Sequence, residues 1–326
     1  MNPETMLDTV EKGCEAATKF QEIIQKVFGP GWTKKQADAE AYAGGRKLQT
    51  IRDNPDMEIV HTKDGMNARM RTLEAFAYRA EQRLLNDAVR EQENLEKIFD
   101  VAADDIKQIT DGSDKTVDDD WLVRFKNISK DISSEEMQYI WGKILANEVE
   151  KPGSFSMRTL ETIRNLSKTE AAVFQKIIPF VIQLNKDYFV SSDSEIVKKY
   201  GIKYGDIMVL DECDLVELNE VSYNPMMKKG SQRNLITDRR IAIITGTSET
   251  SVKVSFSAYK LTNAGKELYQ ILAHSPNNDY FMDVIEYIFN ENIENISVTV
   301  HEVVDNKLEN TTYKTNALRI FKSAQG

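Results

Sequence analysis

Histidine and cysteine are scarce in this chain of 326 residues, which contains three histidines and two cysteines. None of His61, His274 and His301 lies near another histidine or a cysteine at the spacing of metal ligands. Cys14 and Cys213 are also far apart, so free thiols in a reducing cytoplasm are a simpler interpretation than one disulfide bridge. The sequence therefore predicts no metal site and a cytoplasmic location.

Long apolar runs and an excess of cations are also missing. No stretch of about 18 apolar residues, the length that crosses a bilayer, occurs, and the N-terminus lacks the basic and apolar regions of a signal peptide. The 42 Lys and Arg residues are outnumbered by 52 Asp and Glu residues, which gives a net charge of -10. This balance argues against a protein that coats nucleic acid by bulk attraction, so any such contact requires a local basic patch.

Motifs of catalysis and cofactor binding are absent from the sequence. It has no Gly-x-x-x-x-Gly-Lys-Ser/Thr phosphate loop, no Gly-x-Gly-x-x-Gly turn and no Gly-x-Ser-x-Gly elbow. The acidic run Asp118 to Asp120 opens a predicted helix, where negative charge favours the positive end of the helix dipole. Ser154 and Ser156 have no neighbouring base, and one of them is expected to cap a helix. We expect a protein without enzymatic activity and without a cofactor, although an unrecognised nuclease or hydrolase stays open.

Helical patterns are abundant in the first third of the chain. An apolar stripe runs through residues 5–27, and a second helix begins near Thr33. A long helical pattern starts near Thr62 or Asn67 and continues towards Ile109. The stripe of the long pattern consists of Met66, Met70, Leu73, Ala77, Ala80, Leu84, Ala88, Leu95, Ile98 and Ala102. An unbroken helix of about 40 residues would span about 60 Å, so it either packs on the preceding helices or pairs with another chain. Charged flanks favour the second alternative, a coiled-coil or oligomerisation arm.

Residues 116–185 read as four short helices with clear start signals. Thr116 precedes Asp119, Ser133 precedes Glu136 and Ser167 precedes Glu170, and each pair places a hydroxyl three residues ahead of a carboxylate. Two tryptophans, Trp121 and Trp141, lie on the apolar stripes of these helices. They are interpreted as core anchors, with partner binding as the alternative.

The part of the chain after the four short helices carries strand patterns. Residues 241–245 and 252–259 are predicted strands separated by a turn, and Leu261-Thr-Asn-Ala-Gly-Lys-Glu-Leu opens another helix. The order of elements, two helices followed by a β-hairpin and the motif at Leu261, resembles that of a winged-helix domain. We expect a mainly α, multidomain protein: a helical or coiled-coil arm (1–110), a helical module (116–185), a winged-helix-like domain (186–275) and a small α+β segment (276–326).

One basic loop stands out in this acidic protein. Its cations are Lys228, Lys229, Arg233, Arg239 and Arg240. Such a loop can hold phosphates of nucleic acid. However, the predicted helix at 205–217, which would enter a DNA groove, is acidic and would be repelled by the DNA backbone. Contact with nucleic acid through the loop, a solvated loop and a protein contact all stay open.

Three motifs in the helical module resemble those of an uncharacterised bacterial family, a domain of unknown function. They are Asp120-Trp-Leu-Val-Arg-Phe125, the stretch from Glu135 to Glu148, and Pro152-Gly-Ser-Phe-Ser-Met-Arg-Thr-Leu160. The motif residues that this resemblance marks as structural or partner-binding are Trp121, Arg124, Phe125, Trp141, Lys143, Glu148, Pro152, Ser154 and Arg158. The family brings no catalytic residues.

Part of the second motif is also similar to a phrase in abortive-infection proteins of the Abi-alpha type. This similarity implies a role in bacterial defence against phage. The expected function is therefore a non-enzymatic adaptor or sensor in an anti-phage system, forming a homo-oligomer and contacting another defence protein or a phage component. The alternative is a nucleic-acid-binding regulator that uses the basic loop.

Overall fold

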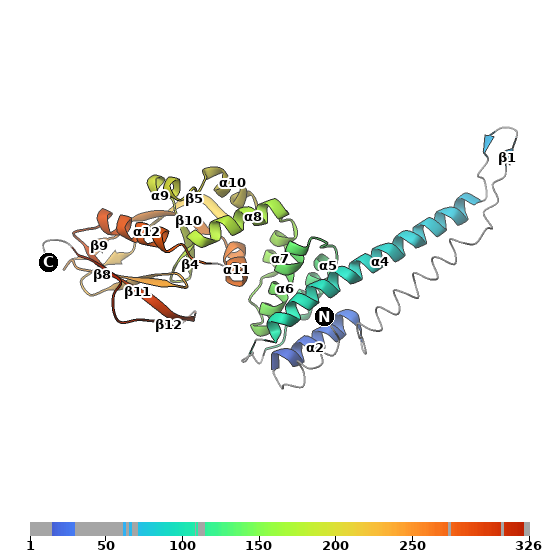
Figure 1. Cartoon of the computed structure of the whole chain (residues 1–326), viewed down its shortest axis with the longest axis horizontal. Coiled ribbons are helices and arrows are strands. Elements are labelled where there is room, and N and C mark those ends of the chain that lie inside the picture. Colours follow the sequence, from blue (N-terminus) through green and yellow to red (C-terminus); the bar gives the residue numbers. More distant parts are fainter. Residues whose placement is uncertain are drawn as a thin grey trace. The chain divides into compact units, whose positions relative to one another are not determined.

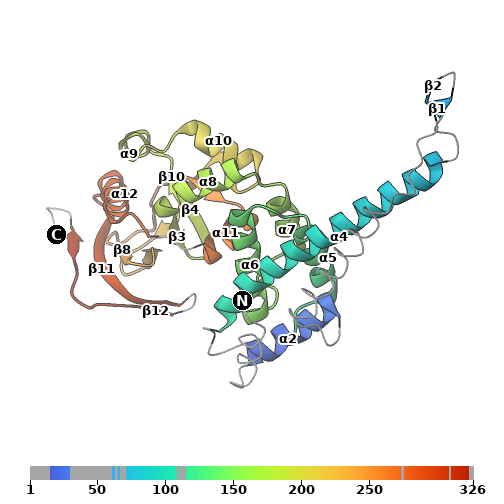
Figure 2. The same cartoon turned by 45° about the vertical axis from the view of Figure 1, so that its right-hand side comes forward.

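The structure is a computed structural model that describes residues 15–29, 61–62, 65–66, 71–107, 109, 115–272, 275–307 and 310–322. These residues belong to two compact units, Met1–Leu160 and Glu161–Gly326. The boundary between the units falls within helix α7 (Met157–Arg164). Among the described residues the first unit is almost entirely helical, whereas the second is built on a β-sheet (Figures 1 and 2).

The first unit contains four described helices besides the start of α7. They are α2 (Glu15–Phe28), α4 (Arg71–Ile106), α5 (Asp119–Ser129) and α6 (Glu135–Glu150), and a short hairpin pairs β1 (His61–Thr62) with β2 (Gly65–Met66). The helix predicted from Thr33 lies outside the described residues. Helix α5 is capped by Asp118, whose carboxylate accepts a hydrogen bond from the Trp121 N–H at 2.9 Å. This cap replaces the predicted hydroxyl of Thr116.

Helices α4 and α6 approach each other closely at Gly142. A Cβ atom at this glycine would lie 2.5 Å from Cβ of Val101 and 2.9 Å from the carbonyl oxygen of Ile98. The missing side chain therefore allows the two helices to touch. In the same turn of α4, Phe99 stacks on Phe20 of α2 with 5.7 Å between the ring centroids. The core of the first unit thus lies where α2, α4, α5 and α6 meet.

The second unit alternates helices and strands along the chain. Its helices are α8 (Lys168–Ile177), the 3-10 helix η1 (Ile178–Phe180), α9 (Ser194–Lys199), α10 (Tyr204–Glu212), α11 (Asn263–Ile271) and α12 (Asn278–Glu291). Its strands are β3 (Ile182–Leu184), β4 (Asp187–Ser191), β5 (Val216–Tyr223), β6 (Met226–Met227), β7 (Gln232–Ile236), β8 (Arg240–Gly246), β9 (Val252–Lys253), β10 (Phe256–Leu261), β11 (Ile296–Lys307), β12 (Asn310–Tyr313) and β13 (Arg319–Phe321). The predicted capping box of Ser167 and Glu170 at the start of α8 is confirmed.

Nine of these strands form one antiparallel sheet in the order β12-β11-β8-β7-β3-β4-β10-β5, with β13 paired to β11. Different helices cover its two faces. On one face Phe289 of α12 packs against Phe321 of β13, with 5.5 Å between ring centroids. On the other face Tyr269 of α11 packs against Tyr188 of β4, at 5.3 Å. The strands β6 and β9 form a separate two-stranded ribbon.

The prediction of a mainly α protein is wrong, because the second unit makes the chain α+β. Short strands such as β3, and polar ones such as β7, give no strong local pattern. The strands β4, β5 and β10 occur in the order expected around α9 and α10, but they belong to the nine-stranded sheet, so the winged-helix prediction is not confirmed. The C-terminal strands are part of this same sheet, because β11 pairs with β8 from Ile296↔Gly246 to Glu302↔Arg240.

Candidate functional site

Helix α4 changes from buried to exposed along its length. Its C-terminal half buries Leu95, Ile98 and Ala102 of the predicted apolar stripe, together with Phe99 and Ala103, whereas Leu84 and Ala88 of the same stripe are exposed. The preceding turns carry Leu84, Leu85, Ala88 and Val89, which we call the exposed α4 patch. The side chains of Leu84, Leu85 and Val89 are 64%, 39% and 40% exposed, and Ala88 is also exposed. Both views show the N-terminal turns of α4 extending beyond α5 and α6 (Figures 1 and 2).

Three charged residues near the patch, Asp87, Arg90 and Glu91, have partners within the first unit. Arg90 lies 3.4 Å from the Asp87 carboxylate, and Glu91 lies 3.1 Å from the ammonium of Lys130 on the C-cap of α5. The patch therefore presents apolar side chains beside charges that are paired at its C-terminal end. Apolar side chains grouped in this way on a surface mark an interaction site more often than isolated ones do.

The predicted motif residues around the α6–α7 connection form a buried clasp. Glu148 is 1% exposed, and its two carboxylate oxygens accept hydrogen bonds from the N–H groups of Gly153 at 2.6 Å and Phe155 at 3.0 Å. The indole Nε1 of Trp121 donates to the carbonyl oxygen of Phe155 at 2.8 Å. A carboxylate that accepts two backbone N–H groups fixes the path of the loop. The clasp stabilises the loop between α6 and α7.

The remaining motif residues divide into core and surface positions. Phe125 and Trp141 are buried and pack with 5.4 Å between ring centroids, as predicted for core anchors. Arg124 and Arg158 are exposed, and Pro152 is half-buried. The hydroxyl of Ser154 donates to the Lys151 carbonyl. The helix cap is Ser156, whose Oγ accepts from the Thr159 N–H at 3.1 Å.

Lys143, the last of the motif residues, links α6 to α4. Its ammonium lies 2.6 Å from the carboxylate of Asp105 and 5.2 Å from the centroid of the Tyr139 ring. Partial burial alone would lower the pKa of Lys143, but hydrogen bonding and the charge of Asp105 raise it above its usual value. The lysine stays charged and contributes to the contact between the two helices.

The five predicted phosphate-binding cations do not form one compact cluster. Lys228 and Lys229 precede β7, whereas Arg239 and Arg240 follow it, and the five residues of β7 span roughly 17 Å. Lys229 pairs with Glu249, whose hydrogen bond and charge raise the pKa of the lysine. Arg239 donates to the Ser275 hydroxyl at 3.4 Å. The structure therefore brings together two pairs of cations rather than all five.

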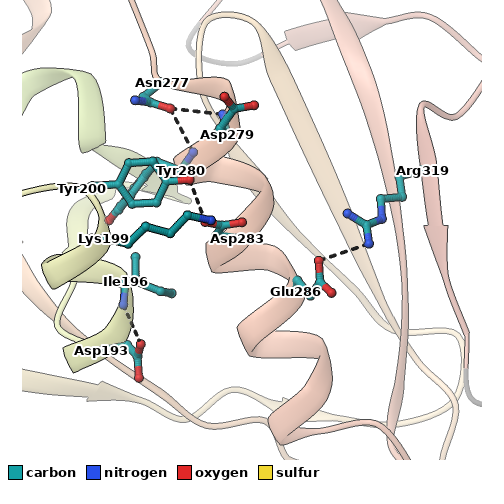
Figure 3. Close-up of polar contacts among 10 residues, drawn as sticks. All are labelled: Asp193, Ile196, Lys199, Tyr200, Asn277, Asp279, Tyr280, Asp283, Glu286 and Arg319. Carbon is teal, nitrogen blue, oxygen red and sulfur yellow. Dashed lines mark hydrogen bonds and ion pairs between the residues drawn. The ribbon is translucent and has the colours of Figure 1, made fainter.

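A polar network between α9 and α12 was not predicted from the sequence (Figure 3). The carboxylate of Asp283 accepts a hydrogen bond from the Tyr200 hydroxyl at 2.6 Å and pairs with the ammonium of Lys199. The Tyr280 hydroxyl accepts from the Ser191 N–H at 2.8 Å. These residues come from segments about 80 positions apart, a separation that leaves no local signal in the sequence.

The protonation states of Tyr200 and Asp283 suit a network that holds α9 and α12 together. Burial, followed by the hydrogen bond and charge of Asp283, raises the pKa of Tyr200, so the phenol stays protonated. Burial would raise the pKa of Asp283, but the hydrogen bonds of Lys199 and Tyr200 lower it overall. A protonated tyrosine and an ionised, paired aspartate hold the two helices together and do not exchange protons at neutral pH.

The thiol of Cys213 is not activated as a nucleophile. Burial, with the charge of Glu170, raises the pKa of the Cys213 thiol to about 11, so the thiol is protonated at neutral pH. Within the described ranges, no group of three or more His, Cys, Asp or Glu side chains is arranged to hold a metal ion. None of the helices in the described part of the chain has both the length and the apolar character needed to cross a membrane.

Fold and site together define an α+β protein in which a helical unit with an exposed apolar patch precedes a unit built on an antiparallel sheet. A family model, protein of unknown function (DUF2806), matches residues 78–285. The chain belongs to this family, in agreement with the uncharacterised family that the sequence suggested. No curated protein and no solved structure matches the chain.

Proposed function

We propose that this protein is a non-enzymatic interaction component, an adaptor or sensor, of a bacterial anti-phage defence system, and that it self-associates through helix α4. The exposed α4 patch is the observation that carries the self-association. Four apolar side chains on two successive turns remain in contact with water, although the same helix buries its apolar residues further along. Removing such side chains from water is the main favourable contribution to protein association.

The defence role is supported by the similarity of the second sequence motif to a phrase in Abi-alpha abortive-infection proteins. The proposed lack of enzymatic activity is supported by the protonated Cys213 thiol and by the structural use of Glu148, Tyr200 and Asp283. A cytoplasmic location agrees with two cysteines far apart in the sequence.

Leu84→Glu is expected to convert an oligomer into a monomer, because the substitution replaces the most exposed large apolar side chain of the patch with a charged one. Val123→Glu is the matched control, since Val123 is 59% exposed on α5 and lies outside the patch. Neither substitution disturbs a buried side chain, so both variants should keep the circular dichroism spectrum of the wild type. Light scattering over a concentration series measures the mass. In phage plating assays the wild type and Val123→Glu should protect cells, and Leu84→Glu should not.

A wild-type protein that stays monomeric throughout the series would contradict the self-association. Equal plaque counts with and without the wild-type gene, tested with a panel of phages, would contradict the defence role.

The alternative function, nucleic-acid binding through the basic residues, has less support because these cations are split between the two ends of β7. If it holds, the affinity of the double variant Arg239→Ala, Arg240→Ala for single-stranded RNA should depend less steeply on salt. The slope of log affinity against log salt should fall in magnitude by about 1–2, because each lost phosphate contact removes about 0.7. Fluorescence anisotropy measures this slope, and Lys198→Ala, Lys203→Ala is a control that removes the same charge from another part of the unit. No anisotropy change for the wild type at low salt would remove the alternative.

A further inference from the structure

We propose that the exposed α4 patch pairs with the same patch of a second copy of this chain, with the two helices antiparallel. This inference rests on the proposed self-association and names its geometry. In this arrangement Leu85 of one copy faces Ala88 of the other, while Leu84 and Val89 flank this contact on its two opposite sides. Because the arrangement is two-fold symmetric, each of these contacts occurs twice.

The spacing of residues along α4 supports a paired helix at this point. Glu81, Leu85, Ala88 and Gln92 are separated by four, three and four residues, which places them on one stripe of the helix surface. The same three- and four-residue spacing continues through Leu95, Phe99 and Ala102, which are buried within the first unit. The stripe that packs inside the unit thus continues into the solvent-exposed turns.

The sizes of the side chains favour the antiparallel orientation. The two large residues, Leu84 and Leu85, come first along the helix, and the smaller Ala88 and Val89 follow one turn later. An antiparallel pair places large side chains against small ones at both ends of the patch. A parallel pair in register would place Leu85 against Leu85 and Ala88 against Ala88, which leaves a gap at the alanines.

The charges favour the same orientation. Glu81 faces the neutral Gln92 of the other copy in the antiparallel pair, whereas it would face a second Glu81 in a parallel one. Arg79, Arg83 and Arg90 are, at 100° per residue, on the opposite side of the helix from the stripe, so pairing does not bring these cations together. A second copy is therefore a partner whose surface fits both the shape and the charge of the patch.

The orientation is tested by disulfide trapping in the full-length protein, with Cys14→Ser and Cys213→Ser removing the native thiols. Two variants, Glu81→Cys and Gln92→Cys, are prepared with different tags, mixed and oxidised. Both substitutions lie at the ends of the stripe and leave the four patch residues intact. The antiparallel pair predicts a disulfide between position 81 of one copy and position 92 of the other. Its yield should exceed that of either variant alone by about tenfold, because pairing raises the effective concentration of the two thiols.

The outcomes separate this inference from the proposed function. A dimer in which Glu81→Cys alone gives the main disulfide product would establish a parallel pair and overturn the antiparallel geometry, while self-association would stand. Loss of trapping after adding Leu84→Glu, with trapping retained after adding Val123→Glu, is the expected control result. A wild-type protein that is monomeric by light scattering, with no trapping in the mixture, would overturn both proposals.

Discussion

Gly142→Ala is expected to lower the free energy of unfolding by about 1–3 kcal/mol, the usual cost of overpacking a well-packed contact. The new methyl group would lie 2.5 Å from Cβ of Val101 and 2.9 Å from the carbonyl oxygen of Ile98, so α4 and α6 would have to move apart. The sign of this effect is informative, because glycine to alanine inside a helix normally stabilises the helix by up to about 1 kcal/mol. Thermal unfolding followed by circular dichroism measures it.

Gly205→Ala is the matched control. Gly205 lies in the first turn of helix α10, and apart from the adjoining backbone no atom lies within 4 Å of the position that a Cβ would take. This substitution should leave the melting temperature unchanged or raise it. If both substitutions stabilise the protein, the close approach of α4 and α6 is not present in solution.

Glu148→Ala is expected to destabilise the first unit by about 2–4 kcal/mol, because the N–H of Phe155 and the partly buried N–H of Gly153 both lose their acceptor. Glu148→Gln should cost less, since its amide oxygen can still accept from one of the two N–H groups. Urea unfolding followed by tryptophan fluorescence suits this measurement, because all three tryptophans fall within Met1–Leu160.

The control for the clasp is Glu150→Gln, which changes the same side chain at an exposed position two residues further along α6. It should leave the urea midpoint unchanged. Hydrogen exchange adds a local measurement: the amides of Gly153 and Phe155 should exchange faster in Glu148→Ala than in the control. Unchanged protection of both amides would contradict the role of Glu148 in holding the loop.

Local patterns predicted much of the helical unit. The apolar spacing along α4 identified Leu95, Ile98 and Ala102 as buried, and the capping box at Ser167 and Glu170 was located correctly, because these features depend on residues three or four positions apart. The large aromatic residues of the helical module were predicted as core for the same reason.

Contacts between residues far apart in the sequence could not be predicted from local patterns. The clasp of Glu148 depends on where a loop folds back, and the network of Tyr200 and Asp283 joins helices that lie far apart in the sequence. The nine-stranded sheet depends on β11 pairing with β8, about 55 positions earlier. The basic residues looked like one loop because they are close in sequence, but β7 between them is extended and separates Lys229 from Arg239.

The pairing of β8 with β11 also determines when the second unit can finish folding during synthesis. Helices α2, α4, α5 and α6 find their partners within the first 160 residues, so this unit can fold while translation continues. Strand β8 carries Ile241, Ile243 and Ile244 and pairs with β7 at once, but its other edge stays open until β11 has been made. An open apolar edge is the surface on which nascent chains aggregate. Completion of β11 therefore closes this edge of β8 only once nearly the whole chain has been made.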